Sequence, residues 1–329
     1  MPQKGHTRPG EILFGTDSHT CMAGVLGCLA FGVGSTDMAN AWLTRDVRVD
    51  VPETVHVRLH SALRPGVCAK DVMLSLLARP EIKSGGAVGK VLEFSGPGLA
   101  GLSLGERATL TNMAVEAGAF TGIIAADELV VHYLMEARGL SRASLERRLV
   151  RADEGANYAF TIDLDLSEVP IMVAVPSDPR SGIPLSELEQ RVGSAVHIDI
   201  AYGGSCTGGK TSDMDLYAEV IREALERGMR VAPGVLFYVQ FGSQSVRRYA
   251  LERGYIELFE RVGASLLDPS CGACIRAGPG TSSSAEQVTV SAVNRNFPGR
   301  SGPGRVYLAS PRVIAASAIV GKIVGGLGP

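Results

Sequence analysis

Three cysteines stand where their thiols could meet at one centre. Cys271 and Cys274 form a Cys-x-x-Cys pair in a glycine- and proline-rich loop, directly after an expected strand at 264–267. Such a pair suits a metal centre, but a redox dithiol or two buried core cysteines fit it too, and a zinc ribbon would need a second pair. Cys206 follows another expected strand, at 197–202, so all three can reach the carboxyl edge of one sheet. Three thiolates without a fourth suggest an iron–sulfur cube with one iron left open.

The segment around Cys206 also fits a phosphate-binding pattern. Residues Gly204 to Thr211 match G-x4-G-K-[ST], after an expected strand and before an expected helix. In that interpretation backbone N–H groups and Lys210 hold phosphates while Thr211 binds magnesium. The acidic partner is weaker, because only Asp268 ends an apolar run. A P-loop NTPase is therefore one alternative function.

Two polar turns could handle a substrate. Asn294, Arg295 and Arg300 lie in a turn-rich loop, and the fork of an arginine matches carboxylate geometry. The turn after the expected strand at 11–14 contains Asp17, Ser18 and His19, which invites comparison with a catalytic triad. Adjacent residues seldom point at one another, however, so an ordinary turn is the alternative.

The elements between these loops predict an α/β fold with mostly parallel sheets. Strands and amphipathic helices alternate along the chain. A run of small residues at 21–34 predicts a tightly packed helix, and alternating valines predict strands within 46–60. The Pro-, Ser- and Gly-rich segment 176–184 is the best candidate boundary. Further strands are expected at 87–94, 122–126, 158–164 and 235–240, and helices at 71–78, 104–119, 141–151, 213–227 and 245–253.

Composition narrows the class of protein. The 329 residues are 45% hydrophobic and 20% charged, which is typical of a globular protein of about two domains. A net charge of −2 and 5% aromatic residues argue against nucleic-acid binding. The sequence contains neither an apolar run long enough for a membrane span nor a secretory signal, so we expect a cytoplasmic protein with reduced thiols. Cys21, Cys28 and Cys68 are interpreted as packing residues.

Four motifs together resemble the aconitase family. They are Gly15-Thr-Asp-Ser-His-Thr, Gly204-Ser-Cys-Thr, Cys271-x-x-Cys and Asn294-Arg-Asn-Phe-Pro-Gly-Arg, in the family's order. Within it, the chain is most similar to the large subunits of 3-isopropylmalate dehydratases, enzymes of leucine biosynthesis. The resemblance implies three-layer α/β domains around a central cluster site: the remainder of a first domain at 1–52, a second at 53–172 and a third at 173–329. It also accounts for the phosphate-binding pattern, because in the family the same loop presents the first cluster cysteine, and Gly208 stands where the family usually has an asparagine.

The resemblance also assigns roles to residues. It implies that Cys206, Cys271 and Cys274 hold a [4Fe-4S] cluster whose fourth iron binds the substrate. It implies that Asn294, Arg295 and Arg300 bind substrate carboxylates, and that Ser18 contacts the substrate. Asp17 and His19 would belong to the catalytic hydrogen-bond network. Asn112 and Glu116, four residues apart on an expected helix, would lie near the cluster, with Asn112 on the substrate side and Glu116 catalytic.

The implied activity is that of a hydro-lyase acting on a hydroxy di- or tricarboxylic acid such as 3-isopropylmalate. Large subunits of the family carry about 100 further residues before the point where this sequence begins. Their serine base and one substrate arginine come from a swivel domain or a small subunit. The sequence is therefore either a truncated or a genuinely reduced homologue, and we expect it to require a small-subunit homologue for activity. A non-catalytic, aconitase-like cluster-binding protein is the second alternative.

Overall fold

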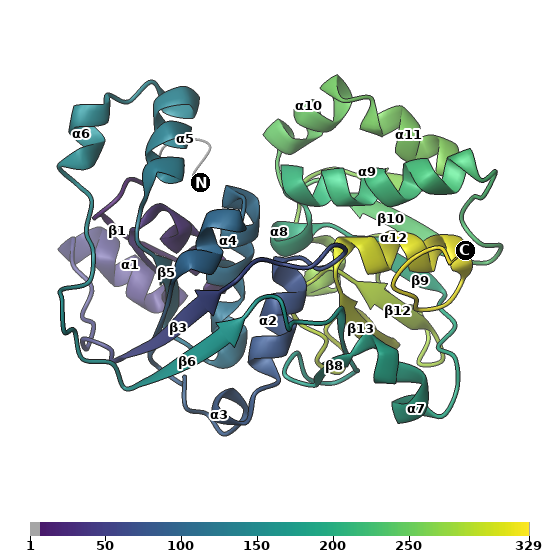
Figure 1. Cartoon of the computed structure of the whole chain (residues 1–329), viewed down its shortest axis with the longest axis horizontal. Coiled ribbons are helices and arrows are strands. Elements are labelled where there is room, and N and C mark those ends of the chain that lie inside the picture. The colour runs from purple at the N-terminus through teal and green to yellow at the C-terminus, as the bar shows by residue number, and fades with distance from the viewer. Residues whose placement is uncertain (1–6, 329) are drawn as a thin grey trace. The chain divides into compact units, whose positions relative to one another are not determined.

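The structure, a computed structural model, describes residues 7–328 (Figure 1). Contacts divide the chain into two compact units. The first comprises Met1–Arg64 and Pro80–Glu168, and the second comprises Pro65–Arg79 and Val169–Pro329. The chain therefore passes from one unit to the other three times. These contacts do not separate residues 1–52 from those that follow, so the three-domain division stays a prediction.

The first unit contains two parallel sheets. Strands β1 (Ile12–Gly15) and β2 (Leu29–Gly32) form a pair, and a four-stranded sheet has the order β5-β4-β3-β6. Side chains in β3 (Thr54–His60) alternate as a half-buried strand requires, with the apolar ones fully buried and the polar ones between them partly exposed. The other three strands are β4 (Val91–Ser95), β5 (Thr121–Ile124) and β6 (Phe160–Asp165).

The expected helix over 21–34 is wrong. A 3₁₀ helix, η2 (Ser18–Leu26), ends at Gly27 in the left-handed conformation and is followed by β2. The small residues serve close packing: a Cβ on Gly24 would lie 2.0 Å from the Gly122 carbonyl oxygen of β5. Side chains are thus excluded where η2 meets the sheet.

The remaining helices of the first unit are mostly short. The expected helix over 104–119 is divided into α4 (Leu104–Asn112) and the 3₁₀ helix η4 (Met113–Ala117). The polar helix expected over 141–151 is shorter in the structure, where only α6 (Arg142–Glu146) is helical. The others are α1 (Ser35–Thr44), α3 (Pro80–Lys83), η3 (Pro97–Gly101) and α5 (Glu128–Arg138).

The second unit is built on a seven-stranded sheet of order β11-β10-β9-β12-β13-β7-β8. The first five strands are parallel, whereas β7 and β8 run antiparallel to their neighbours. The chain runs outward from β9 through β10 to β11 and then returns to the other side of β9 with β12. The strand order therefore reverses between β9 (Ile200–Gly203) and β12 (Val288–Ser291). The remaining strands are β7 (Met172–Ala174), β8 (Gly182–Pro184), β10 (Leu236–Gln240), β11 (Ser265–Leu267) and β13 (Arg305–Ala309).

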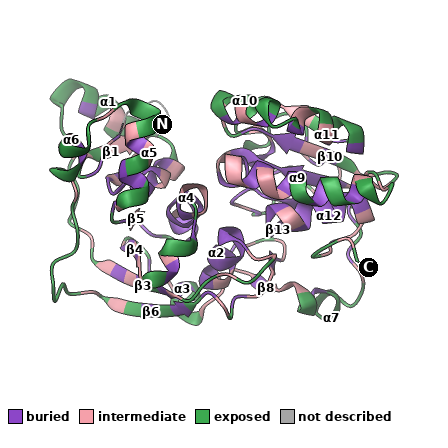
Figure 2. Cartoon of the chain, turned by 45° about the horizontal axis from the view of Figure 1, so that its top comes forward, coloured by how far each residue is buried: buried purple, intermediate pink, exposed green. Residues whose placement is uncertain are grey.

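Helices cover this sheet. The amphipathic helix α9 (Thr211–Glu226) packs against α11 (Tyr255–Val262) and α12 (Pro311–Val320), and α12 contacts β9. The helix α2 (Ala69–Leu77) packs on β7 and β8, and it is buried along nearly its whole length (Figure 2). By contrast, α10 (Gln244–Glu252) is largely exposed. Short helices complete the unit: α7 (Leu188–Val192), α8 (Ser205–Gly208), η5 (Leu185–Glu187) and η6 (Gly272–Ile275).

The α/β class with mostly parallel sheets is confirmed. Two local expectations are wrong: no strand lies between residues 46 and 53, and segment 176–184 is no boundary, because β8 within it pairs with β7. Segment 46–53 has residue types typical of strands, and segment 176–184 has residue types typical of turns. Whether a segment forms a strand depends, however, on whether a neighbouring strand pairs with it. Among the described helices, none is long and apolar enough to cross a membrane.

Candidate functional site

The three candidate cysteines and the Asn294 loop follow strands of the same parallel sheet. Cys206 comes three residues after the end of β9, and Asn294 comes three residues after the end of β12, the strand beside it. Cys271 and Cys274 follow β11 at one end of the sheet. The carboxyl ends of parallel strands share one edge, and ligands bind where the strand order reverses. The topology thus places Cys206 and Asn294 at the most favourable point.

The turn after β9 brings Cys206 to Asn294. Gly204 has φ +129°, and a Cβ there would lie 2.4 Å from the Gln240 carbonyl oxygen. Ser205 has φ +66°, an unusual conformation for a non-glycine residue and one that often marks functional sites. The half-buried Cys206 Sγ lies 3.7 Å from Asn294 Oδ1, and Thr207 Oγ1 donates a hydrogen bond to the same oxygen.

The loop of Cys271 and Cys274 is attached to the centre of the sheet by two buried side chains. Tyr202 of β9 donates its hydroxyl to Gln240 Oε1 at 2.8 Å. Gln240 Nε2 in turn donates to Ser270 Oγ at 2.7 Å and to the Asp268 carbonyl oxygen at 3.2 Å. Burial, with a smaller contribution from the neighbouring thiols of Cys274 and Cys271, raises the pKa of Tyr202 to about 12.

These residues have the donor chemistry of an iron–sulfur cluster. Among residues 7–328, no three His, Cys, Asp or Glu side chains gather closely enough to hold one ion. In a cluster each cysteine binds its own iron, so the thiols need not converge on one point. The donor set is three cysteines on two strand-end loops of one sheet, after β9 and β11, with one cysteine half-buried, one exposed and one buried. That set suits the soft ligation that iron–sulfur clusters require.

The loop after β12 presents cations and an amide. Asn294 is completely buried, whereas Arg295 and Arg300 are half-buried. Arg300 Nε is buried and has no hydrogen-bond partner among the described residues. A buried guanidinium N–H without an acceptor is costly, so this side chain is suited to receive an anion.

In the first unit, the structure brings His19 together with Glu116. Asp17 caps η2 by accepting the backbone N–H of His19 at 2.8 Å. His19 Nε2 lies 3.0 Å from Glu116 Oε1, and the Glu116 side chain has no exposed surface. His19 Nδ1 lies 3.5 Å from Ser18 Oγ and 3.6 Å from Asp17 Oδ1. The partner of the histidine is thus a distant glutamate, and not an adjacent serine and aspartate arranged as a triad.

Asn112 and the other cysteines complete the packing of these elements. Asn112 is buried at the end of α4, immediately before η4 carries Glu116, and its carbonyl oxygen accepts the thiol of Cys21 at 3.4 Å. Cys28 is buried and donates its thiol to the Ala23 carbonyl oxygen. Burial raises the pKa of Cys28 to about 12 and that of Cys68 well above its ordinary value. These pKa shifts support the packing interpretation of Cys28 and Cys68.

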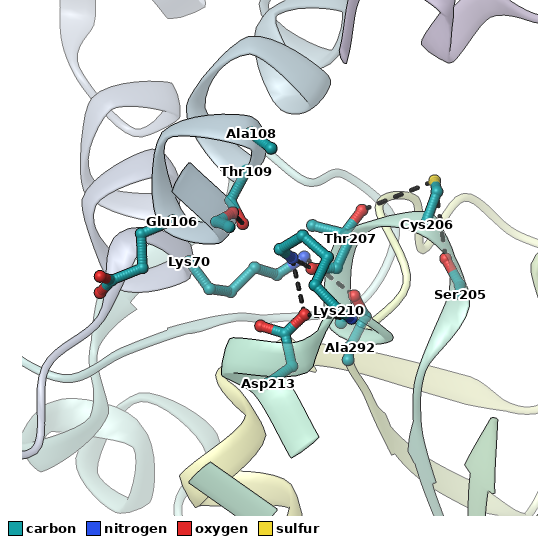
Figure 3. A network of polar contacts seen from close by, with 12 residues as sticks. Lys70, Glu106, Ala108, Thr109, Ser205, Cys206, Thr207, Lys210, Asp213 and Ala292 are labelled. Atoms are coloured by element: carbon teal, nitrogen blue, oxygen red, sulfur yellow. Dashed lines mark hydrogen bonds and ion pairs between the residues drawn. The ribbon is translucent and has the colours of Figure 1, made fainter. Parts of the chain in front are cut away.

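The structure does not support the phosphate-binding alternative. In place of an open loop, residues Ser205–Gly208 form the helical turn α8. Lys210 Nζ is occupied within the protein, because it donates to the Thr207 carbonyl oxygen and to Asp213 Oδ2 (Figure 3). The lysine that a P-loop would aim at phosphates therefore holds its own turn.

Sequence reasoning missed several residues that shape this edge. Tyr202 and Gln240 are buried polar groups of strands and belong to none of the motifs, whereas Thr207 lies within the Gly204-Ser-Cys-Thr motif but was given no role. Lys70 is buried as well, at the beginning of an apolar helix. A charged residue next to a strongly apolar run was the one available signal for Lys70.

Comparison with known proteins identifies the class to which this fold and site belong. Residues 1–321 match the aconitase family (aconitate hydratase). The chain belongs to the aconitase family.

Particular relatives are similar over nearly the whole chain. The 3-isopropylmalate dehydratase large subunit 1 of Pyrococcus furiosus is 40% identical over 325 residues, which cover 98% of this chain and 73% of the relative. The large subunit from Aquifex aeolicus is 37% identical, with 98% and 72% covered. The crystal structure of Thermococcus kodakaraensis aconitase X is 13% identical with a TM-score of 0.50, covering 99% of this chain and 69% of that one. This likeness concerns the fold.

Proposed function

We propose that this chain is the large subunit of a [4Fe-4S]-dependent hydro-lyase acting on a hydroxy di- or tricarboxylic acid such as 3-isopropylmalate. Family membership supports a hydro-lyase. The observation that carries the finer proposal is the pairing of Cys206 with Asn294 where the strand order reverses. Metal-ligand and carboxylate-binding chemistry thereby share one sheet edge.

Three cysteines would hold the cluster. Cys206 would come from the turn after β9, and Cys271 and Cys274 from the loop after β11. When bound, such a cluster with one open iron supplies a Lewis acid that assists departure of a hydroxyl group. Tyr202 and Gln240 would fix the second of these loops through the hydrogen bonds to Ser270 and Asp268.

The Asn294 loop would bind the substrate's carboxylates. Arg300 has a buried N–H in need of an acceptor, and a carboxylate oxygen is the acceptor that matches a guanidinium fork. Arg295 adds a second cation one residue after Asn294. Because proton removal beside a carboxylate builds negative charge on that group, fixed cations would stabilise the transition state.

His19 and Glu116 would handle protons. Their 3.0 Å contact allows a proton to be held between His19 Nε2 and Glu116 Oε1, and burial of Glu116 keeps water away from it. Asp17 orients the turn by accepting the His19 backbone N–H, and Ser18 presents a hydroxyl for the substrate. Asn112 precedes the turn that carries Glu116, with its side chain proposed to face the substrate.

The partner would be a small-subunit homologue. The names of the relatives describe large subunits, which implies a second polypeptide in those proteins. We extend this to the present chain, with the small subunit supplying the remaining catalytic groups. Adding it would therefore be required for turnover.

Anaerobic reconstitution tests the proposal. The chain is treated with iron and sulfide, its iron is counted, and EPR spectra are recorded after mild oxidation. About four irons per chain, falling to a three-iron signal, are expected for a cube held by three cysteines. Dehydration of 3-isopropylmalate is then measured with and without an added small-subunit homologue, and activity is expected only with it.

Cysteine variants and two further outcomes distinguish the proposed function from its alternatives. A Cys206→Ser chain should lose the cluster, whereas Cys28→Ser is the matched control because the buried thiol of Cys28 donates to the Ala23 carbonyl oxygen and is no proposed ligand. Cluster assembly without activity in the presence of several small subunits would favour a non-catalytic cluster-binding protein. Failure to bind iron, together with tight binding of a magnesium nucleotide, would contradict the proposal and revive the P-loop alternative.

A further inference from the structure

A buried lysine contacts the loop that carries the proposed carboxylate-binding residues. Lys70 lies at the second position of α2 and is 3% exposed. Its Nζ donates to the carbonyl oxygens of Val293 at 2.9 Å and Ala292 at 3.3 Å, directly before Asn294 (Figure 3). Lys70 and the loop at 292–294 both belong to the second unit.

These carbonyl groups lie beyond the end of β12. The strand ends at Ser291, after which the backbone N–H of Ala292 donates to Tyr202 and that of Val293 donates to the Ser291 hydroxyl. Apart from this one backbone bond from Ala292 to β9, no bond to a neighbouring strand is seen for residues 292 and 293 in the described part of the chain. A cationic donor shared by two buried carbonyls is one of the stronger hydrogen-bond arrangements available to a loop.

The far side of the loop is also fixed. Asn296 is 2% exposed, and its Nδ2 donates to the carbonyl oxygens of Val175 at 2.8 Å and Val306 at 3.1 Å. The backbone oxygen of Asn296 accepts the N–H of Ser177. Asn294 and Arg295 thus lie between two anchored points, with Lys70 on one side and Asn296 on the other.

Asp71 and Asp213 interact electrostatically with Lys70. Burial raises the pKa of Asp71 to about 6 and also raises the pKa of Asp213, and the positive charge of Lys70 partly offsets both increases. Asp213 also pairs with Lys210 at 2.6 Å. Two lysines and two carboxyl groups therefore form a buried cluster that links α2 and α9 to the loops after β9 and β12.

We propose that Lys70 is a positioning residue, which sets Asn294 and Arg295 in register for the substrate carboxylate by holding the two carbonyls before them. This inference rests on the proposed function for the identity of the substrate. Lys70 itself does not reach the substrate in this proposal. Its contribution is geometric, and small displacements of a binding group can cost up to about a hundredfold in catalysis.

The test compares Lys70→Met with Val313→Ala in the reconstituted complex with the small subunit. Val313 is a fully buried core residue of α12 in the same unit, so its truncation lowers stability without touching the loop. For Lys70→Met, KM for 3-isopropylmalate should rise between about tenfold and a hundredfold while kcat changes by less. Hydrogen exchange of amides 292–296 should accelerate in Lys70→Met and remain at the wild-type rate in Val313→Ala.

The two readouts separate the possible failures. Unchanged exchange at 292–296 in Lys70→Met would overturn the proposal, and so would faster exchange with an unaltered KM. An equal rise of KM in Val313→Ala would also overturn it, because lost stability alone would then explain the effect. If the wild-type complex fails to convert any hydroxy-dicarboxylate, the proposed function fails, whereas the exchange data still show whether Lys70 fixes the loop.

Discussion

At the scale of single residues, the most informative contact is the one between His19 and Glu116, which lie 97 positions apart in the sequence. A glutamate in a short helix is normally solvated, yet this side chain has no exposed surface. The cost of burying a carboxyl group is reduced by the imidazole beside it. We propose that this buried acid–base pair transfers protons.

Replacing Glu116 tests this assignment. Glu116→Gln keeps an acceptor for His19 Nε2 but removes the titratable group, so kcat should fall on the order of 10²- to 10⁴-fold with little change in KM. Steady-state kinetics of the reconstituted complex measures both. Glu136→Gln, at an exposed position of α5, is the control and should retain wild-type rates. Equal kcat values for the Glu116 variant and the wild type would remove Glu116 from the catalytic network.

Asp71 makes stability depend on pH. Its pKa is raised by burial from 3.8 to about 6, so the folded state binds the proton more tightly than the unfolded state does. The stabilisation is complete below about pH 4 and is lost as pH rises through 6, by roughly 3 kcal/mol. Urea denaturation at pH 4 and pH 7 should show the wild type losing this stability relative to Asp71→Asn. The exposed Asp50→Asn variant should parallel the wild type, and a constant difference between wild type and Asp71→Asn would contradict the assigned pKa.

At the scale of elements, the sequence predicted those whose pattern is local. The alternation of β3 and the apolar period of α9 each specify one buried face, and the structure confirms them. The helix α2 was expected to be amphipathic, but it is buried on nearly every side. The small residues at 21–34 carry no such period, so a 3₁₀ helix and a strand appear where one helix was expected. These small residues allow close packing, such as the contact of Gly24 with Gly122, and that contact depends on a residue 98 positions away in the sequence.

The same distinction applies to the candidate site. The cysteines and the Asn294 loop were recognisable because their residue types recur in family motifs. Lys70 and Gln240 were not, since each acts through a hydrogen bond to a loop distant in sequence. Thr207 lies within one of these motifs, but its hydrogen bond to Asn294 joins two motifs 87 positions apart. Pairing between distant segments sets which polar groups are buried together, and no local pattern encodes it.

At the scale of the whole molecule, the two units are interleaved in sequence. Residues 65–79 leave the first unit's chain and supply α2 to the second. There α2 covers β7 and β8, and Asp71 accepts the backbone N–H of Met172 at 2.9 Å. A cut at the border near residue 169 therefore does not yield an intact second unit.

Fragments of the chain test this interleaving. Five apolar side chains of α2 are fully buried: Val72, Met73, Leu74, Leu76 and Leu77. At about 1.5–3 kcal/mol each, their burial contributes on the order of 10 kcal/mol, which is comparable to the stability of a whole domain. Residues 169–329 alone should therefore fail to unfold cooperatively in urea. The same fragment joined through a flexible linker to residues 65–79 should show a cooperative transition by circular dichroism. A joined fragment carrying Leu74→Asp is the matched control and should behave like 169–329 alone. Cooperative unfolding of 169–329 with the midpoint of the joined fragment would show that α2 is dispensable to the second unit.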